Sequence, residues 1–115
     1  MPPYACRTAI DVRQLRALVT VIDEGTFTDA GIALRTSQAS ISRAVADLER
    51  TVGARLLQRT SSGAVPTVTG TRVIEHARRV LAEIDAIEHL RTRAEAELRV
   101  GFAWSIFGSL TVGAQ

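Results

Sequence analysis

The sequence predicts a mainly α-helical fold in which three short helices and a β-hairpin precede one long helix. Apolar residues recur at helical spacing in three segments between residues 11 and 52 and again over residues 68–96. Residues 55–66 change instead to two short extended pieces around a turn. Residues 1–10 contain two prolines and no periodicity, so we expect them to form a flexible arm.

The first two helices are expected over Val12–Glu24 and about Thr28–Leu34. Asp11 and Gln14 have the spacing of a capping box, in which each side chain bonds to the backbone of the other residue. Gly31 lies in the middle of the second segment and costs about 0.8–1 kcal/mol of helix propensity relative to alanine. The second helix is therefore expected to be locally soft.

The third helix is expected to begin after Ser37, a good N-cap. Its apolar residues share one narrow arc, which we predict to be buried: Ile41, Val45, Leu48 and Val52. The opposite side is small, polar and basic: Ala39, Ser42, Arg43, Ala46 and Arg50, with Gln38 at the tip. Glutamine and arginine match the hydrogen-bonding edges of adenine and guanine in the major groove of DNA. This helix alone also fits an ordinary amphipathic core helix, and its neighbours decide between the two interpretations.

The neighbouring segments favour the DNA-binding interpretation. Two helices joined by a tight turn form a helix-turn-helix. Strands are expected at Arg55–Arg59 and Ala64–Pro66 around a turn-rich tip. A hairpin directly after a helix-turn-helix is a wing, so residues 11–67 are predicted to be a winged helix-turn-helix domain.

A long linker helix is expected over residues 68–96. At about 40 Å it would be longer than one small domain can cover. Heptad spacing therefore predicts an interface with a second copy through Val73, Ala77, Val80, Leu81, Ile84 and Ile87. Its charged residues Arg78 and Arg79 are expected to form ion pairs with Glu75 and Glu83 on the same helix.

Residues 97–103 alternate between polar and apolar side chains, as a strand does. We expect residues 97–115 to be the first strand and following residues of a further domain that is truncated in this sequence.

Composition points away from several other classes of protein. The formal net charge is +2, and all fourteen basic residues are arginine, so placement rather than net charge has to indicate nucleic acid. The single cysteine allows no intrachain disulfide, and neither a signal-peptide pattern nor an apolar run of about 18 residues is present. We therefore expect a cytoplasmic protein that is not bound to a membrane.

Neither a cofactor site, a metal site nor a catalytic site is expected. His76 and His89 lie thirteen residues apart without further ligands in a matching arrangement, and glycine-rich phosphate loops are absent. The acidic pairs are interpreted as helix-end and solvated charges, without a nearby histidine or serine for acid–base chemistry: Asp23 with Glu24, and Asp47 with Glu49.

Six motifs occur in order along the chain: LRALVTVIDEGTFTDA (Leu15–Ala30), SQASISRAVADLE (Ser37–Glu49), GARLLQRT (Gly53–Thr60), TVTG (Thr67–Gly70), EHARRVL (Glu75–Leu81) and LRVG (Leu98–Gly101). Together they resemble the N-terminal DNA-binding part of a LysR-type transcriptional regulator. The resemblance implies sequence-specific binding to double-stranded DNA, a homodimer paired through the linker helix, and a dyad-symmetric operator. It also implies that a small-molecule effector binds only in a full-length form.

The resemblance also assigns site residues. Its base-reading positions fall on Gln38, Ala39, Ser42 and Arg43. Its phosphate-contacting positions fall on Thr28, Ser37, Ser40, Arg59 and Thr60. An alternative remains open, in which the chain is a protein-interaction module that forms mixed dimers with a full-length regulator.

Overall fold

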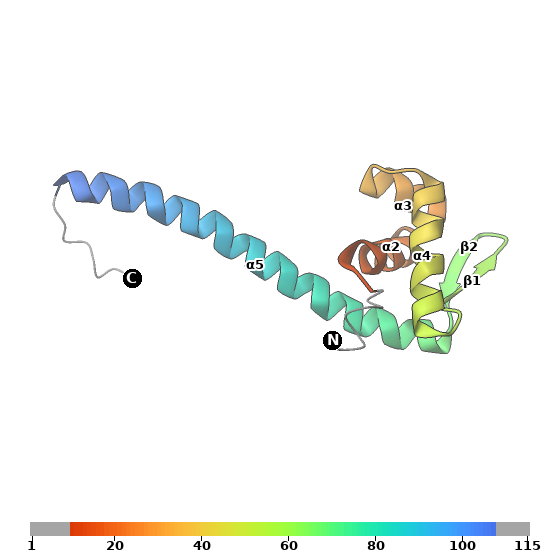
Figure 1. The fold of residues 1–115 in the computed structure, drawn as a ribbon. Coiled ribbons are helices and arrows are strands. Elements are labelled where there is room, and N and C mark those ends of the chain that lie inside the picture. The colour runs from red at the N-terminus through yellow and green to blue at the C-terminus, as the bar shows by residue number, and fades with distance from the viewer. Residues whose placement is uncertain (1–9, 108–115) are drawn as a thin grey trace. The chain divides into compact units, whose positions relative to one another are not determined.

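The computed structural model describes residues 10–107, except for the side chains of Thr92 and of residues 99–107. Its elements follow one another as α2 (Val12–Glu24), α3 (Phe27–Leu34), α4 (Gln38–Val52), β1 (Leu57–Thr60), β2 (Gly63–Pro66) and α5 (Val68–Phe107) (Figure 1). The predicted fold class, a winged helix-turn-helix followed by a long helix, is confirmed. The chain divides into two compact units, Met1–Leu81 and Ala82–Gln115.

Both ends of α2 form as predicted. The backbone N–H of Gln14 donates to Oδ1 of Asp11 at 3.0 Å, and the N–H of Asp11 donates to Oε1 of Gln14 at 3.3 Å. The helix ends at Gly25, whose φ of 92° lies in the left-handed region that glycine adopts without strain.

Close packing explains the glycine within α3. Gly31 is buried, and a Cβ built on it would lie 3.0 Å from the carbonyl oxygen of Thr36 and 3.3 Å from the backbone nitrogen of Gln38. A larger residue would therefore push α3 away from the start of α4. The unfavourable helix propensity of this glycine is offset by the tight turn that it permits.

The core lies where α2 packs against α3 and α4. Its largest fully buried side chains are Leu18, Val21, Leu48 and Leu56. The prediction that Val52 is buried is wrong, because this side chain is 36% exposed. Val52 is the last residue of α4, and the chain turns away at Gly53, so its side chain lies at the margin of the core.

The wing is a two-stranded antiparallel hairpin in which Leu57 pairs with Pro66 and Thr60 with Gly63. The backbone N–H of Ala64 donates to the carbonyl oxygen of Gly25 at 3.0 Å, which attaches the hairpin to the turn between α2 and α3. The start of β2, next to the hairpin turn, is therefore held by the helical core.

The first part of α5 belongs to the same core. Thr67 caps the helix, since its hydroxyl accepts from the backbone N–H of Gly70 at 2.9 Å, and Ile74 and Ala77 are buried. A Cβ on Gly70 would overlap the backbone carbonyl of Leu56, so α5 starts in direct contact with the chain that leads into the wing.

The strand predicted over residues 97–103 is wrong, because α5 continues as a helix through these residues to Phe107. A strand needs a neighbour for its backbone hydrogen bonds. In the described part of the chain β1 and β2 pair with each other, and a helix satisfies these groups locally. Alanine, glutamate, leucine and arginine also favour the helix here.

Candidate nucleic-acid interface

The candidate interface is built on the first turns of α4. Ser37 caps this helix, because its hydroxyl oxygen accepts a hydrogen bond from the backbone N–H of Ser40 at 3.0 Å. The Ser37 hydroxyl donates in turn to Oγ of Ser40 at 3.2 Å. A hydroxyl has one donor and two acceptor positions. The O–H of Ser40 is therefore left to donate to an acceptor outside the protein.

The orientation of α4 agrees with the helical pattern. One side is buried in the core through Ile41, Val45 and Leu48. The other side exposes Gln38, Ala39, Arg43, Ala46 and Arg50, with Ser42 half-buried beside them. The helix thus presents small side chains around one arginine and one glutamine, and such a surface can approach another surface closely.

The tip of α4 is held by α3. The hydroxyl of Thr28 donates to Oε1 of Gln38 at 3.2 Å. This contact uses one acceptor position of the Gln38 amide oxygen, which leaves both amide N–H groups and one oxygen lone pair of this exposed side chain available to a partner. An outward amide with a free donor and a free acceptor can form the two-bond pairing that glutamine makes with adenine.

Arg59 connects the wing to both helices of the helix-turn-helix. From β1, its Nη2 donates to Oγ of Ser42 on α4 at 3.3 Å. Its guanidinium carbon also lies 4.1 Å from the centre of the Phe27 ring at the start of α3. A guanidinium has five N–H donors. Arg59 can therefore hold the wing against α4 and still offer N–H groups to a partner, because its side chain is exposed.

Thr60 lies at the end of the same strand, next to the wing tip. Its hydroxyl donates to the carbonyl oxygen of Gly63 at 3.2 Å and lies 3.5 Å from Oγ of Ser62. These contacts shape the turn. The predicted phosphate-contacting residues thus lie on three elements that meet around α4, and each of their side chains also orders the local structure.

Glu49 has a structural role that the sequence analysis did not identify. Its Oε2 accepts hydrogen bonds from the backbone N–H groups of Leu56 at 2.8 Å and Leu57 at 3.2 Å, and lies 3.6 Å from Nε of Arg55. The interpretation of Glu49 as a solvated charge is wrong, because its side chain is only 18% exposed. Helical spacing placed Glu49 on α4 but carried no information about the later segment that packs beside it.

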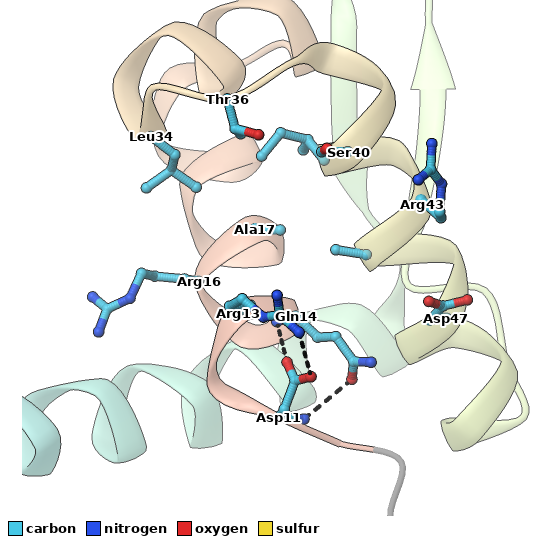
Figure 2. Close-up of a pocket in the computed structure, with 12 residues that line it drawn as sticks. Asp11, Arg13, Gln14, Arg16, Ala17, Leu34, Thr36, Ser40, Arg43 and Asp47 are labelled. Atoms are coloured by element: carbon cyan, nitrogen blue, oxygen red, sulfur yellow. Dashed lines mark hydrogen bonds and ion pairs between the residues drawn. The ribbon is translucent and has the colours of Figure 1, made fainter.

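A groove of about 530 Å³ separates α2 from α4 next to the candidate interface (Figure 2). Ala17 lies within it, and Arg43 and Asp47 of α4 lie opposite Arg13 of α2, while Arg16 points away. Three arginines and two aspartates line this groove, and Nη2 of Arg13 lies 3.7 Å from Oδ2 of Asp11. The groove is not uniformly basic, so we assign no ligand to it.

The apolar residues of α5 divide between two faces. Ala77 is buried in the core of its own chain, and Val73 and Leu81 pack against that core. The burial of Ala77 in its own chain argues against a contact with a second copy, and its place in the dimer interface stays a prediction. Val80 and Ile87 are exposed, as is Leu98 further along, with Ile84 half-buried among them. At 100° per residue these four fall on one stripe beside the face that packs on the core.

For Arg78, the ion pairing expected within α5 is replaced by a contact to α2, whereas the pairing of Arg79 stays a prediction. Arg78 donates to both carboxylate oxygens of Asp23, from Nη2 to Oδ1 at 2.7 Å and from Nη1 to Oδ2 at 3.2 Å. The hydrogen bond from Arg78 holds the pKa of Asp23 below its usual value, against a smaller opposing effect of burial. Sequence spacing suggested partners on the same helix, whereas the fold brings together two residues that are 55 positions apart.

Two further findings concern the described residues as a set. Their helices include none that combines the length and the apolar character needed to cross a membrane. Within the same residues, histidine, cysteine, aspartate and glutamate side chains do not gather in groups of three or more that could hold a metal ion.

Comparison with known proteins gives a consistent set of matches. Residues 12–71 match the family described as bacterial regulatory helix-turn-helix protein, lysR family. A probable HTH-type transcriptional regulator LrrA of Synechococcus elongatus is 41% identical over 80 residues, covering 70% of this chain and 27% of the relative. The SDS degradation transcriptional activation protein of a Pseudomonas species is 39% identical over 95 residues, which cover 79% of this chain and 31% of the relative. The chain thus matches about 30% of the length of these two relatives, and both are regulators by name rather than enzymes.

Solved structures resemble the same part of the chain. The CbnR_DBD–DNA complex has a TM-score of 0.65 at 34% identity and covers 76% of this chain and 99% of that one. The BenM_DBD complex with catB site 1 DNA has a TM-score of 0.68 at 31% identity and covers 73% and 93%. Both neighbours are complexes with DNA.

Proposed function

The chain belongs to the lysR family of bacterial regulatory helix-turn-helix proteins, and from this membership we propose that it is a sequence-specific DNA-binding transcriptional regulator. In this proposal α4 enters the major groove of a dyad-symmetric operator. The observation that carries it is the exposed side of α4, where Gln38 and Arg43 stand among small side chains. The similar CbnR and BenM structures, both DNA complexes, support the same reading.

Base recognition is assigned to the first two turns of α4. Gln38 and Arg43 supply the hydrogen-bonding groups that pair with adenine and guanine edges, and Ala39 supplies a methyl group suited to the methyl of thymine. Ser42 lies beside them, with its hydroxyl oxygen bonded to Arg59.

Phosphate contacts are assigned to five residues that surround this surface: Thr28, Ser37, Ser40, Arg59 and Thr60. Ser40 and Arg59 have N–H or O–H groups free to donate to a phosphate. The hydroxyls of Thr28, Ser37 and Thr60 would first have to exchange their bonds to Gln38, Ser40 and Gly63 for a phosphate oxygen. These residues lie at the start of α3, at the start of α4 and on β1. A surface that carries groups on both sides of a reading helix can meet the two phosphate backbones that border a major groove.

Dimerisation is assigned to the exposed stripe of α5. Val80, Ile84 and Ile87 repeat at coiled-coil spacing, and Leu98 extends the stripe. A second copy that covered this stripe would remove exposed apolar area from water, which is the main driving force for such pairing. Two copies related by a twofold axis would read two half-sites, and action on chromosomal DNA places the protein in the cytoplasm.

Selection of binding sites from a random duplex pool, at two salt concentrations, tests the proposal. We expect a motif of two inverted half-sites, bound at least about a thousandfold more tightly than random DNA. Binding that is salt-sensitive but without a motif would overturn the base-reading role, because phosphate contacts alone carry no sequence information.

Single substitutions then test the base-reading residues. Arg43→Ala should cost about 1–3 kcal/mol on the selected site and relax the preference at one base pair. Arg79→Ala serves as the matched control, because Arg79 is exposed on α5, away from α4. An equal loss of affinity on selected and random DNA would contradict the base-reading role of Arg43.

The exposed stripe of α5 also supports a second candidate function, in which the chain pairs with α5 of a longer relative and titrates it. In that case Val80→Asp abolishes the effect of the chain on the longer relative, and Gln38→Ala leaves this effect intact. A regulator that reads DNA itself loses activity with both substitutions, so the two variants separate the candidates.

A further inference from the structure

We propose that the Asp23–Arg78 ion pair sets the direction in which α5 leaves the winged domain, and thereby the half-site spacing that a dimer prefers. This inference rests on the proposed function, because it concerns how two DNA-reading domains are placed on one operator. Asp23 and Arg78 would be positioning residues and would not touch DNA.

The geometry of the pair is directional. Both guanidinium nitrogens of Arg78 donate to the two carboxylate oxygens of Asp23, at 2.7 Å and 3.2 Å. Two parallel hydrogen bonds fix the relative orientation of the two planar groups as well as their distance. Asp23 lies in the last turn of α2 and Arg78 in the third turn of α5, so the pair joins the two helices directly.

The other contacts of α5 hold its base. Thr67 donates from its hydroxyl to the carbonyl oxygen of Arg55 at 2.6 Å, and Gly70 packs against the backbone of Leu56. Ile74 and Ala77 then bury apolar surface against the core. Apolar burial keeps the helix on the domain but is not directional. Among the described side-chain contacts between α5 and the winged domain, the ion pair is therefore the specific polar contact farthest from the base of the helix.

The distance between the base of α5 and the ion pair makes the pair effective in orienting the helix. Arg78 lies eight residues beyond Gly70, which is about 12 Å along a helix. The exposed stripe begins two residues later, at Val80. Val80 lies about 15 Å along the helix from Gly70, and a pivot of about 10° at the base would displace it by roughly 3 Å. That displacement is close to the rise of one base pair, about 3.4 Å.

The pair is exposed, and this sets the size of the expected effect. The side chain of Arg78 is 48% exposed and that of Asp23 is 50% exposed. Each ion pair therefore stabilises the orientation of α5 only modestly, and this stabilisation weakens as the salt concentration rises. A symmetric dimer contains two copies of the ion pair. We expect its loss to reduce the preference for the best half-site spacing over its neighbours by about three- to tenfold.

The test is a spacing series on the full chain. Duplexes carry two inverted copies of the selected half-site, separated in steps of one base pair, and a duplex with one half-site serves as reference. Arg78→Met removes the charge and keeps the aliphatic stem, and Asp23→Asn removes the charge from the other side. Arg79→Met is the matched control on the same turn, and the double exchange Asp23→Arg with Arg78→Asp tests rescue. Ratios of affinity between spacings at one salt concentration cancel the phosphate contribution, which is common to all duplexes.

We expect Arg78→Met and Asp23→Asn to broaden or shift the spacing preference while binding to the single half-site changes by less than about twofold. Arg79→Met should keep the wild-type profile, and the charge exchange should restore it at least in part. Wild-type spacing ratios in Arg78→Met, with an unchanged circular dichroism spectrum, would overturn the inference.

A measurement without DNA separates this inference from the proposed function. Spin labels at Ala46→Cys on α4 and Arg79→Cys on α5, with Cys6 replaced by serine, report the distance between the two helices. Removal of the ion pair should broaden this distance distribution. An unchanged distribution would refute the orienting role whether or not DNA binds. A broadened distribution in a chain that selects no duplex would instead refute the proposed function, and with it the link to half-site spacing.

Discussion

Replacing Glu49 by alanine should detach the base of the wing from α4. One carboxylate oxygen accepts the backbone N–H groups of Leu56 and Leu57, both of which belong to nearly fully buried residues. Hydrogen bonds to a charged group contribute about 1.5–3 kcal/mol each. The two bonds share one oxygen, and the carboxylate keeps some contact with water, so we expect Glu49→Ala to lower the free energy of unfolding by about 2–4 kcal/mol.

This loss is large for a small domain. It corresponds to a fall in melting temperature of about 10–25 °C, since 1 kcal/mol shifts a domain of this size by about 4–8 °C. Glu49→Gln keeps an acceptor oxygen and should lower the free energy of unfolding by about half as much. Glu75 is an exposed glutamate on α5, and Glu75→Ala therefore serves as the control. Thermal and urea denaturation followed by circular dichroism measure the difference. If the free energies of unfolding of the Glu49→Ala and Glu75→Ala variants lay within about 0.5 kcal/mol of each other, Glu49 would not hold the wing to α4, because surface substitutions usually stay within that range.

Three further outcomes are expected. Arg59→Met should lower the free energy of unfolding by about 1 kcal/mol through loss of the cation–π contact. It should also reduce the slope of the logarithm of the DNA-binding constant against log salt by about 0.9 per protomer. Lost stability with an unchanged slope would confine Arg59 to a structural role. The hydrogen bond from Arg78 lowers the pKa of Asp23 in the folded chain. The contribution of Asp23 to the stability of the folded state is therefore present above the unfolded pKa of about 3.9 and is lost as the pH falls through the folded pKa. The difference in melting temperature between wild type and Asp23→Asn should therefore be seen at pH 7 and shrink below about pH 4, and a difference that grew on acidification would contradict this assignment. Gly70→Ala should strongly destabilise the chain or prevent folding, because the added methyl group would overlap the carbonyl of Leu56; a melting temperature near that of wild type would show that α5 can move at its base.

Local sequence signals predicted the elements of the winged domain. The capping box at Asp11, the N-cap at Ser37 and the left-handed glycines at the helix ends act over a few residues, so they can be read without the fold. The outward side of α4 was predicted for a related reason. Burial of Ile41 on one side of a helix fixes the direction of Arg43 on the other.

Local signals failed where a distant partner decides the outcome. Residues 97–103 alternate like a strand, but a strand also needs a neighbour, and α5 continues instead. The choice between strand and helix for such a segment depends on available backbone partners, which the alternation itself does not specify.

The helix ends, the polar and basic side of α4 and the apolar periodicity of α5 can be predicted from local sequence, because each follows from side chains within one or two turns of each other. The contacts of those side chains depend on how the helices and the wing pack together. In the folded chain Glu49 bonds to the base of the wing, Arg59 lies between Ser42 and Phe27, Ala77 is buried in the core and Asp23 pairs with Arg78. Such pairings join residues far apart along the chain, and their geometry exists only after the helices have packed.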